Sequence, residues 1–123
     1  MIGVDSSFII DLQRKNISKS SLELTENIAM SHLVFFECLS GTKNQKEEMA
    51  LLDFEKHTTQ IPHSFESIKL ASYIFKELKT KGKEIGRLDC LIASAYITNG
   101  ISQILTRNKK HFEKFPGITC IDY

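Results

Sequence analysis

Short apolar segments that alternate with segments of helical periodicity constrain the fold of this chain most strongly. Short segments that end in or consist of apolar residues, and that are predicted to be strands, recur along the 123-residue sequence at residues 1–4, 28–30, 58–61, 102–105 and 118–121. Between them, apolar residues recur at intervals of three and four, which is typical of helices that pack on one side. Strands that are apolar throughout are buried on both faces, as in a parallel sheet covered by helices. The sequence therefore predicts a three-layer α/β/α fold with a central parallel sheet of four to five strands, in a single domain over residues 1–123.

Serines mark where several of the helices are expected to begin, because a serine side chain can accept a hydrogen bond from the first free backbone N–H groups. Ser31 is expected to cap a helix through about residue 39, and Ser64 a long amphipathic helix. Other helices are predicted at residues 6–14, 22–27, 45–56 and 88–98. The inner face of the long helix is predicted to comprise Ile68, Ala71, Ile74, Phe75 and Leu78.

The composition excludes several classes of protein. Sixteen basic and fifteen acidic side chains leave a net charge of +1, so any attraction for nucleic acid must come from local patches. No apolar run approaches the ~20 residues that cross a bilayer, and the first residues lack the pattern of a signal peptide. The protein is therefore expected to be cytoplasmic, with no membrane association. The widely spaced Cys38, Cys90 and Cys120 fit neither a disulfide framework nor a zinc site.

Three acidic residues stand in apolar surroundings where a surface charge is not expected. Asp5 follows the first apolar run, Glu37 lies within Leu-Val-Phe-Phe-Glu-Cys-Leu, and Asp89 lies within Leu-Asp-Cys-Leu-Ile-Ala. Asp5 alone can equally be a helix cap. Buried carboxylates are costly unless they are paired or bound to metal, and the helix dipole near Asp89 offsets only about 1 kcal/mol of that cost. The three acids are therefore expected to meet in space.

Binding of a divalent cation would explain why three acidic side chains lie close together. Carboxylates packed together raise one another's pKa unless a cation joins them. Hard cations such as Mg²⁺ or Mn²⁺ prefer oxygen ligands, and they activate water for attack on a phosphodiester. In a parallel sheet the ligand lies outside the carboxyl ends of the strands. Asp5 and Thr106 each follow a predicted strand directly, so both are expected at that edge.

Four blocks of the sequence resemble those of PIN-domain ribonucleases, in particular the VapC-type toxins of toxin–antitoxin pairs. The first is the strand with Asp-Ser-Ser at residues 2–7, and the second is Ser31 with the Glu-Cys-Leu-Ser-Gly block at residues 37–41. The third is the Asp-Cys-Leu-Ile-Ala block within residues 82–93, and the fourth is Leu-Thr-Arg-Asn-Lys-Lys-His-Phe at residues 105–112, with Pro-Gly-Ile after it. The blocks occur in the family's order and span nearly the whole chain, so the resemblance implies a PIN-like fold.

The resemblance implies a role for each site residue. Asp5, Glu37 and Asp89 would be the catalytic, metal-binding acids for Mg²⁺ or Mn²⁺. Supporting hydrogen bonds would come from Ser6, Ser31 and Thr106. This sequence departs from the family where a fourth acid often stands, because it has Asn108 there and His111 three residues later. The three acids are expected to hold one ion, with Asn108 a weak ligand and a second ion bound only with substrate phosphate.

The resemblance also implies the substrate and the partners. An endoribonuclease of this kind would cut RNA through water activated by the ion, would be blocked by a cognate antitoxin whose segment enters the acidic groove, and would form a homodimer. The basic residues beside the acids are either a solvated helix end and loop or contacts to RNA phosphates. The candidate RNA contacts are Arg87, Arg107, Lys109 and His111.

Two other functions remain as alternatives. A catalytically weakened PIN domain could bind RNA or a protein partner without cutting, and Asn108 in place of an acid favours that reading. A phosphotransfer receiver or phosphatase with Asp5 as the phosphoryl acceptor would need a second acid beside Asp5 and a lysine after a later strand. The sequence has serines and Thr106 at those places, which argues against this alternative.

Overall fold

A parallel sheet of five strands forms the centre of the computed structural model, which describes residues 1–14 and 26–123. Every neighbouring pair of strands is parallel, and the order across the sheet is β3-β2-β1-β4-β5. The predicted parallel sheet is therefore confirmed. The strands are β1 (Ile2–Val4), β2 (Ile28–Ser31), β3 (Thr59–Ile61), β4 (Gln103–Leu105) and β5 (Thr119–Ile121).

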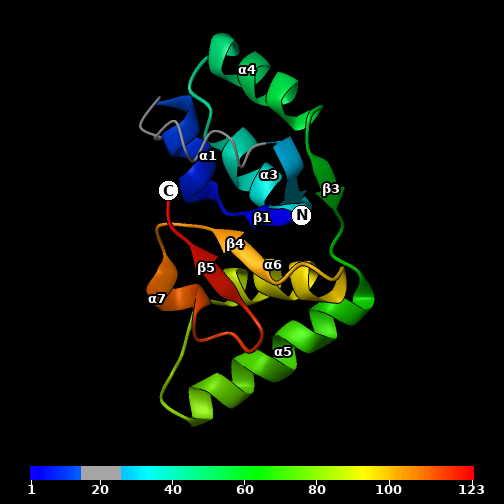
Figure 1. Cartoon of the computed structure of the whole chain (residues 1–123), viewed down its shortest axis with the longest axis vertical. Coiled ribbons are helices and arrows are strands. Elements are labelled where there is room, and N and C mark those ends of the chain that lie inside the picture. The colour runs from blue at the N-terminus through cyan, green and yellow to red at the C-terminus, as the bar shows by residue number, and fades with distance from the viewer. Residues whose placement is uncertain (15–25) are drawn as a thin grey trace.

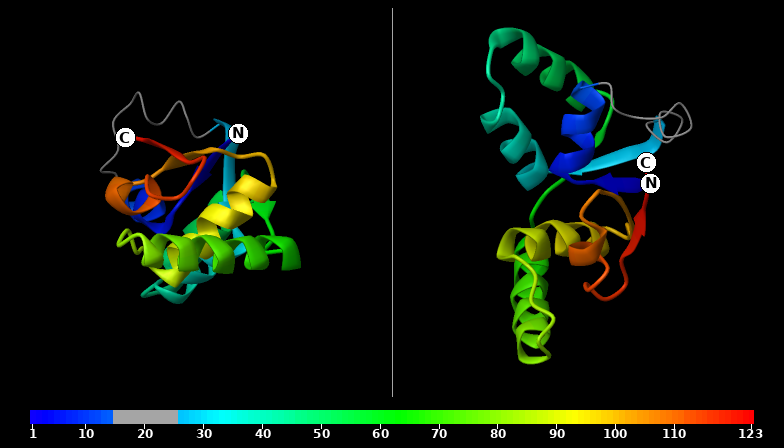
Figure 2. Two further views of the ribbon diagram at one scale, coloured as in Figure 1. Left: turned by 90° about the horizontal axis from the view of Figure 1, so that it is seen from below. Right: turned by 90° about the vertical axis from the view of Figure 1, so that its left-hand side faces the viewer.

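Helices cover both faces of this sheet, which confirms the three-layer fold. In Figure 1 and in the right-hand view of Figure 2, α1, α3 and α4 lie on one side of β1, and α5 and α6 lie on the other. The helix expected at residues 22–27 falls largely outside the described residues. None of the described helices combines the length and apolar character that a bilayer crossing requires. The helices are α1 (Ser6–Gln13), α3 (His32–Ser40), α4 (Gln45–Glu55), α5 (Phe65–Thr80), α6 (Arg87–Thr98) and α7 (Lys109–Phe112).

The order of the strands creates a switch point beside β1. The chain runs from β1 to β2 and β3 on one side, and then returns to β4 on the other side of β1. The connections therefore diverge at the carboxyl ends of β1 and β4, where open α/β sheets form their ligand crevice. Val4 pairs with Leu105, so the next residues, Asp5 and Thr106, leave the sheet together at this point.

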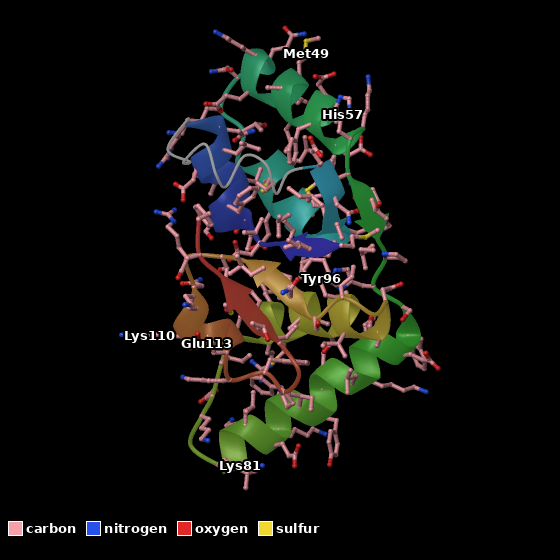
Figure 3. The ribbon with its side chains drawn as sticks, viewed as in Figure 1. Met49, His57, Lys81, Tyr96, Lys110 and Glu113 are labelled. Carbon is pink, nitrogen blue, oxygen red and sulfur yellow. The ribbon has the colours of Figure 1, made fainter. Side chains whose placement is uncertain are left out.

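Tyr96 on α6 fills the centre of the core. The side chain is fully buried, and Figure 3 shows it between α6 and β1. Its hydroxyl accepts hydrogen bonds from the backbone N–H groups of Val4 (3.2 Å) and Ser31 (3.1 Å) and donates to the Val4 carbonyl. Tyr96 thus joins the carboxyl ends of β1 and β2 to the helix beneath them.

The inner face of α5 differs from the prediction at one position. Ile68 is 45% exposed, and Ser67 is buried in its place. Ala71, Ile74 and Leu78 are buried as predicted. Residues 67, 71, 74 and 78 follow one another at intervals of four, three and four, so they lie on one stripe of the helix. The prediction of Ile68 was wrong because a small polar residue, and not the nearest large apolar one, continues that stripe.

Candidate active site

Asp5 is held at the carboxyl end of β1 by hydrogen bonds to both carboxylate oxygens. The residue is 4% exposed. Its Oδ1 accepts from Ser7 Oγ at 2.6 Å and from the Phe8 backbone N–H at 3.3 Å. Its Oδ2 accepts from Thr106 Oγ1 at 2.5 Å. The bond from Phe8 makes Asp5 the cap of α1, so the capping role and a place in the acidic site are not alternatives.

Glu37 and Asp89 approach Asp5 from helices on opposite faces of the sheet. Glu37 lies on α3, which Ser31 begins by accepting a hydrogen bond from the Val34 N–H at 3.1 Å. Asp89 lies in the first turn of α6, where the helix dipole favours an anion. Its Oδ2 is 3.2 Å from Nδ1 of His111 on α7.

The pKa shifts indicate that these three acids act on one another. Burial raises the pKa of Asp5 above its ordinary value, against the hydrogen bonds from Ser7, Thr106 and Phe8, and the charge of Asp89 raises it further. Burial likewise raises the pKa of Glu37, with added contributions from Asp89 and then Asp5. The structure therefore brings the three predicted acids to one edge of the sheet.

The donor chemistry of these acids fits a divalent cation, which prefers carboxylate oxygens and removes their mutual repulsion. In residues 1–14 and 26–123, however, no three histidine, cysteine or acidic side chains lie close enough together to hold an ion as they stand. The side chains of Glu37 and Asp89 are both partly exposed. An ion held by all three acids would therefore require their side chains to move closer together than they are in this arrangement.

The predicted supporting residues differ in the contacts that they make within the protein. The Thr106 hydroxyl donates to Asp5 and accepts from the Asn108 N–H at 2.8 Å. Ser6 lines the same open pocket as Glu37, whereas the hydroxyl that bonds to Asp5 belongs to Ser7. The Asn108 side chain forms no capping hydrogen bond to α7.

The four side chains expected to contact RNA each have a partner within the protein. Those of Arg87, Arg107 and His111 are exposed, and that of Lys109 is partly exposed. The partners are Asp11 for Arg107 (Nε to Oδ2, 2.8 Å), Asp122 for Lys109 (3.3 Å), Asp89 for His111 (3.2 Å) and the Phe75 ring for Arg87 (4.8 Å). The four residues predicted to contact RNA therefore also make contacts within the protein.

Sequence reasoning missed three residues around the site: Ser7, Asp11 and Tyr96. Asp11 lies in the apolar stretch Phe-Ile-Ile-Asp-Leu, so the reasoning that singled out Glu37 could also have found it. The choice between Ser6 and Ser7 depends on the rotation of α1. The partners of the Tyr96 hydroxyl depend on which strands meet, and the local sequence carries no signal for that.

Fold and site together define an α/β protein with acidic residues at the switch point of a parallel sheet. The family model described as the PIN domain matches residues 2–118. The chain therefore belongs to the PIN-domain family.

Within the PIN-domain family, the chain is most informatively compared with ribonucleases of the VapC type. Ribonuclease VapC1 of Rickettsia felis is 30% identical over 125 residues, which cover 96% of this chain and 92% of that protein. Ribonuclease VapC1 of Methanocaldococcus jannaschii is 33% identical over 114 residues, which cover 92% and 79%. The predicted resemblance to VapC ribonucleases is thereby confirmed. Such ribonucleases generally depend on a divalent metal ion.

Solved structures agree with this assignment. A crystal structure of VapBC2 from Rickettsia felis, bound to a DNA fragment from its promoter, matches with a TM-score of 0.83 and 26% identity, covering 100% of this chain and 99% of that one. VapBC-1 from nontypeable Haemophilus influenzae matches with a TM-score of 0.84 at 19% identity, covering 99% and 98%. The second match supports the fold alone.

Proposed function

We propose that this chain is a metal-dependent endoribonuclease and the VapC-type toxin of a toxin–antitoxin pair, acting as one domain over residues 1–123. The observation that carries the proposal is the buried Asp5, which is fixed at the switch point within electrostatic range of Glu37 and Asp89. Buried acids that repel one another lower the stability of a fold, so they occur mainly where they serve a function. Binding of a cation is such a function, because it removes the repulsion.

Asp5, Glu37 and Asp89 would hold a Mg²⁺ or Mn²⁺ ion. When bound, such an ion lowers the pKa of water and stabilises charge on the phosphoryl oxygens of RNA. Asn108 brings an amide oxygen without charge, so a second ion would need phosphate oxygens from the substrate.

The chain's own residues orient these acids. Ser7 and Thr106 fix the two oxygens of Asp5, and Ser31 begins the helix that carries Glu37. His111 lies against Asp89, with its Nδ1 3.2 Å from Asp89 Oδ2. Cations at the rim, among them the exposed Arg87 and the partly exposed Lys109, would neutralise RNA phosphates.

The proposed partners are RNA, a cognate antitoxin and a second copy of this chain, in the cytoplasm. The likeness to VapBC assemblies supports the antitoxin. Large apolar side chains exposed on α5 and α6 offer surface for contact with a protein partner. They are Phe65 (73% exposed) and Ile68 (45%) on α5, and Leu88 (51%) on α6.

A cleavage assay tests the nuclease proposal. Wild-type protein should cut structured RNA with Mg²⁺ or Mn²⁺, and EDTA should abolish the activity. Asp89→Asn should lower the rate by more than about 100-fold, because even outer partners of metal ligands contribute about 10–100-fold. Asp53→Asn is the matched control, since Asp53 is exposed on α4. Cleavage that survives both EDTA and Asp89→Asn would contradict the proposal.

A growth assay tests the toxin assignment separately. Expression of the wild type in a bacterial host should arrest growth, and Asp89→Asn should not. Co-expression of the neighbouring antitoxin gene should restore growth. If RNA is cut in vitro but growth continues, the ribonuclease proposal stands and the toxin proposal fails.

A binding module that does not cut RNA is the alternative, and Asn108 in place of a fourth acid favours it. It predicts that the wild type retains RNA in a gel-shift assay with Mg²⁺ but yields no fragments. Asp89→Asn would then bind RNA at least as tightly as the wild type, because one repelling charge has been removed.

A further inference from the structure

A second buried carboxylate, Asp11 on α1, lies outside the group of three acids. Asp11 is 5% exposed. Its Oδ2 is 2.8 Å from Nε of Arg107 and accepts a hydrogen bond from the Tyr123 hydroxyl at 2.6 Å. A buried carboxylate without such partners would be strongly destabilising, so Asp11 holds both of them in place.

Arg107 is connected to both side-chain donors of Asp5, Thr106 and Ser7. Thr106, immediately before it, donates to Asp5 Oδ2. The backbone N–H of Arg107 donates to Ser7 Oγ at 3.1 Å, and Ser7 in turn donates to Asp5 Oδ1. Arg107 is therefore attached to α1 twice, through its backbone at Ser7 and through its side chain at Asp11, one turn further along the helix.

Tyr123 is connected to Asp5 through Phe8, the third hydrogen-bond donor of the Asp5 carboxylate. Its ring meets the Phe8 ring edge to face, with centroids 5.0 Å apart and an interplanar angle of 87°. The Phe8 backbone N–H is itself a donor to Asp5 Oδ1. Asp11, Arg107 and Tyr123 thus each lie one or two contacts from the Asp5 carboxylate, and all three attachments lead to its hydrogen-bond donors.

We propose that Asp11, Arg107 and Tyr123 form a positioning cluster that holds Ser7 and Thr106 against Asp5 and so fixes the orientation of the Asp5 carboxylate. The inference rests on the proposed function, since the cluster acts through a metal-binding acid. It also changes the role of Arg107, which becomes an internal tether of the turn after β4. Outer partners that orient metal ligands contribute about 10–100-fold to metal affinity or activity.

Steady-state kinetics separate this role from RNA contact. Arg107→Gln and Asp11→Asn should each lower kcat on RNA by about 10–100-fold, with KM and its dependence on salt unchanged. Because both changes break the same tether, the double variant should be no slower than the slower single variant. Asp53→Asn, an exposed acid-to-amide change on α4, should match the wild type. If Arg107→Gln instead raises KM and lowers the salt dependence by about one ion, Arg107 contacts RNA and the proposal is overturned.

Binding of Mn²⁺ without RNA, measured by electron paramagnetic resonance of the free ion, gives a readout that does not depend on cleavage. Asp11→Asn and Arg107→Gln should each weaken binding by about 10–100-fold. Unchanged affinity in both variants overturns the positioning role. If Asp11→Asn fails to fold, Tyr123→Phe keeps the ring on Phe8, removes one bond to Asp11 and should weaken binding by about tenfold. For this change, Tyr73→Phe on the exposed surface of α5 is the control.

The two proposals fail in different ways. A wild type that binds Mn²⁺ but does not cut RNA, with weaker binding in the cluster variants, overturns the nuclease function and retains the positioning cluster. A wild type that cuts RNA, with variants that equal it in kcat and in Mn²⁺ affinity, overturns the cluster and retains the nuclease. A wild type that neither cuts RNA nor binds Mn²⁺ overturns both.

Discussion

The ring of Tyr96 occupies the space in which a side chain at Gly3 would lie. A Cβ on Gly3 would be 2.8 Å from two carbons of that ring, which is closer than side chains pack. The glycine therefore allows α6 to approach β1 and brings the Tyr96 hydroxyl to the backbone of Val4, next to Asp5. A pair of residues buried in the core thus determines where the strand that carries the first acid ends.

Removal of the Tyr96 hydroxyl should destabilise the fold. Tyr96→Phe keeps the ring but leaves the buried N–H groups of Val4 and Ser31 without this acceptor. We expect the free energy of unfolding in urea to fall by about 1–3 kcal/mol. Tyr73→Phe, at a 62% exposed site, should change it by less than about 0.5 kcal/mol. If Tyr96→Phe is as stable as the wild type, the hydrogen bonds from Val4 and Ser31 to Tyr96 do not stabilise the fold, and the prediction is wrong.

A methyl group at Gly3 should strain the contact with Tyr96. Gly3→Ala should lower the free energy of unfolding by about 1–3 kcal/mol, as overpacking of a core does. Tyr96→Leu removes the ring, so Gly3→Ala should cost less in that background than in the wild type. Urea unfolding of the four proteins measures this coupling, and purely additive effects would disprove the contact as the cause.

Neutralising Glu37 should stabilise the metal-free protein at neutral pH. Burial and the charges of Asp89 and Asp5 raise the pKa of Glu37 above its ordinary 4.5. The folded state therefore holds its proton to a higher pH than the unfolded state, and stability is lost as pH rises from about 4.5 through the raised pKa. In EDTA, Glu37→Gln should unfold at higher urea than the wild type at pH 7, and this gain should shrink at pH 4.

The same pair of proteins reports on the cation. Added Mn²⁺ should stabilise the wild type more than Glu37→Gln, because a ligand that binds only the folded state raises its stability. Glu84→Gln, at an exposed position before α6, serves as the control and should follow the wild type throughout. A gain at pH 7 in the control as large as that in Glu37→Gln would assign the effect to net charge alone.

The three cysteines should react slowly with thiol reagents in the native protein. Burial raises the pKa of Cys38 to about 12 and those of Cys90 and Cys120 to about 11. At pH 8 roughly one Cys90 or Cys120 thiol in 1,000 would be ionised, and the thiolate is the reactive form. Ellman's reagent should detect three thiols promptly in guanidinium chloride but not in buffer, where Cys120, the most accessible, should react first. Prompt reaction of Cys38 in buffer would contradict the burial.

The elements that the sequence predicted correctly are those whose signal is local. The apolar run at residues 28–30 became β2, and Ser31 and Ser64 cap α3 and α5, because runs and caps involve neighbouring residues only. The helix α7 was not predicted, since four residues in Lys-Lys-His-Phe carry no helical period. The central place of β1 was not predicted either, because strands of three or four residues do not encode which partner they pair with.

In the candidate site, too, the residues with a local sequence signal could be predicted and the contacts between distant residues could not. Asp5, Glu37 and Asp89 could be predicted because each is a charge in an apolar stretch, and that anomaly is visible in the sequence. The hydrogen bonds that orient them join residues far apart along the chain, such as Thr106 with Asp5 and His111 with Asp89. Ile68 shows the reverse error, since it was assigned to the inner face of α5 and is 45% exposed.

The pairing of β1 with β4 has a consequence during synthesis of the protein. Val4 lies opposite Leu105, and Asp5 receives its bond from Thr106, a residue 101 positions later. The central strand therefore leaves the ribosome long before one of its two neighbours exists, and contacts of such sequence separation form late in folding. A nascent chain cannot form the hydrogen bond that holds Asp5 Oδ2 until translation has passed Thr106. A partner that binds the growing chain before that point would meet an Asp5 carboxylate that still lacks one of its hydrogen-bond donors.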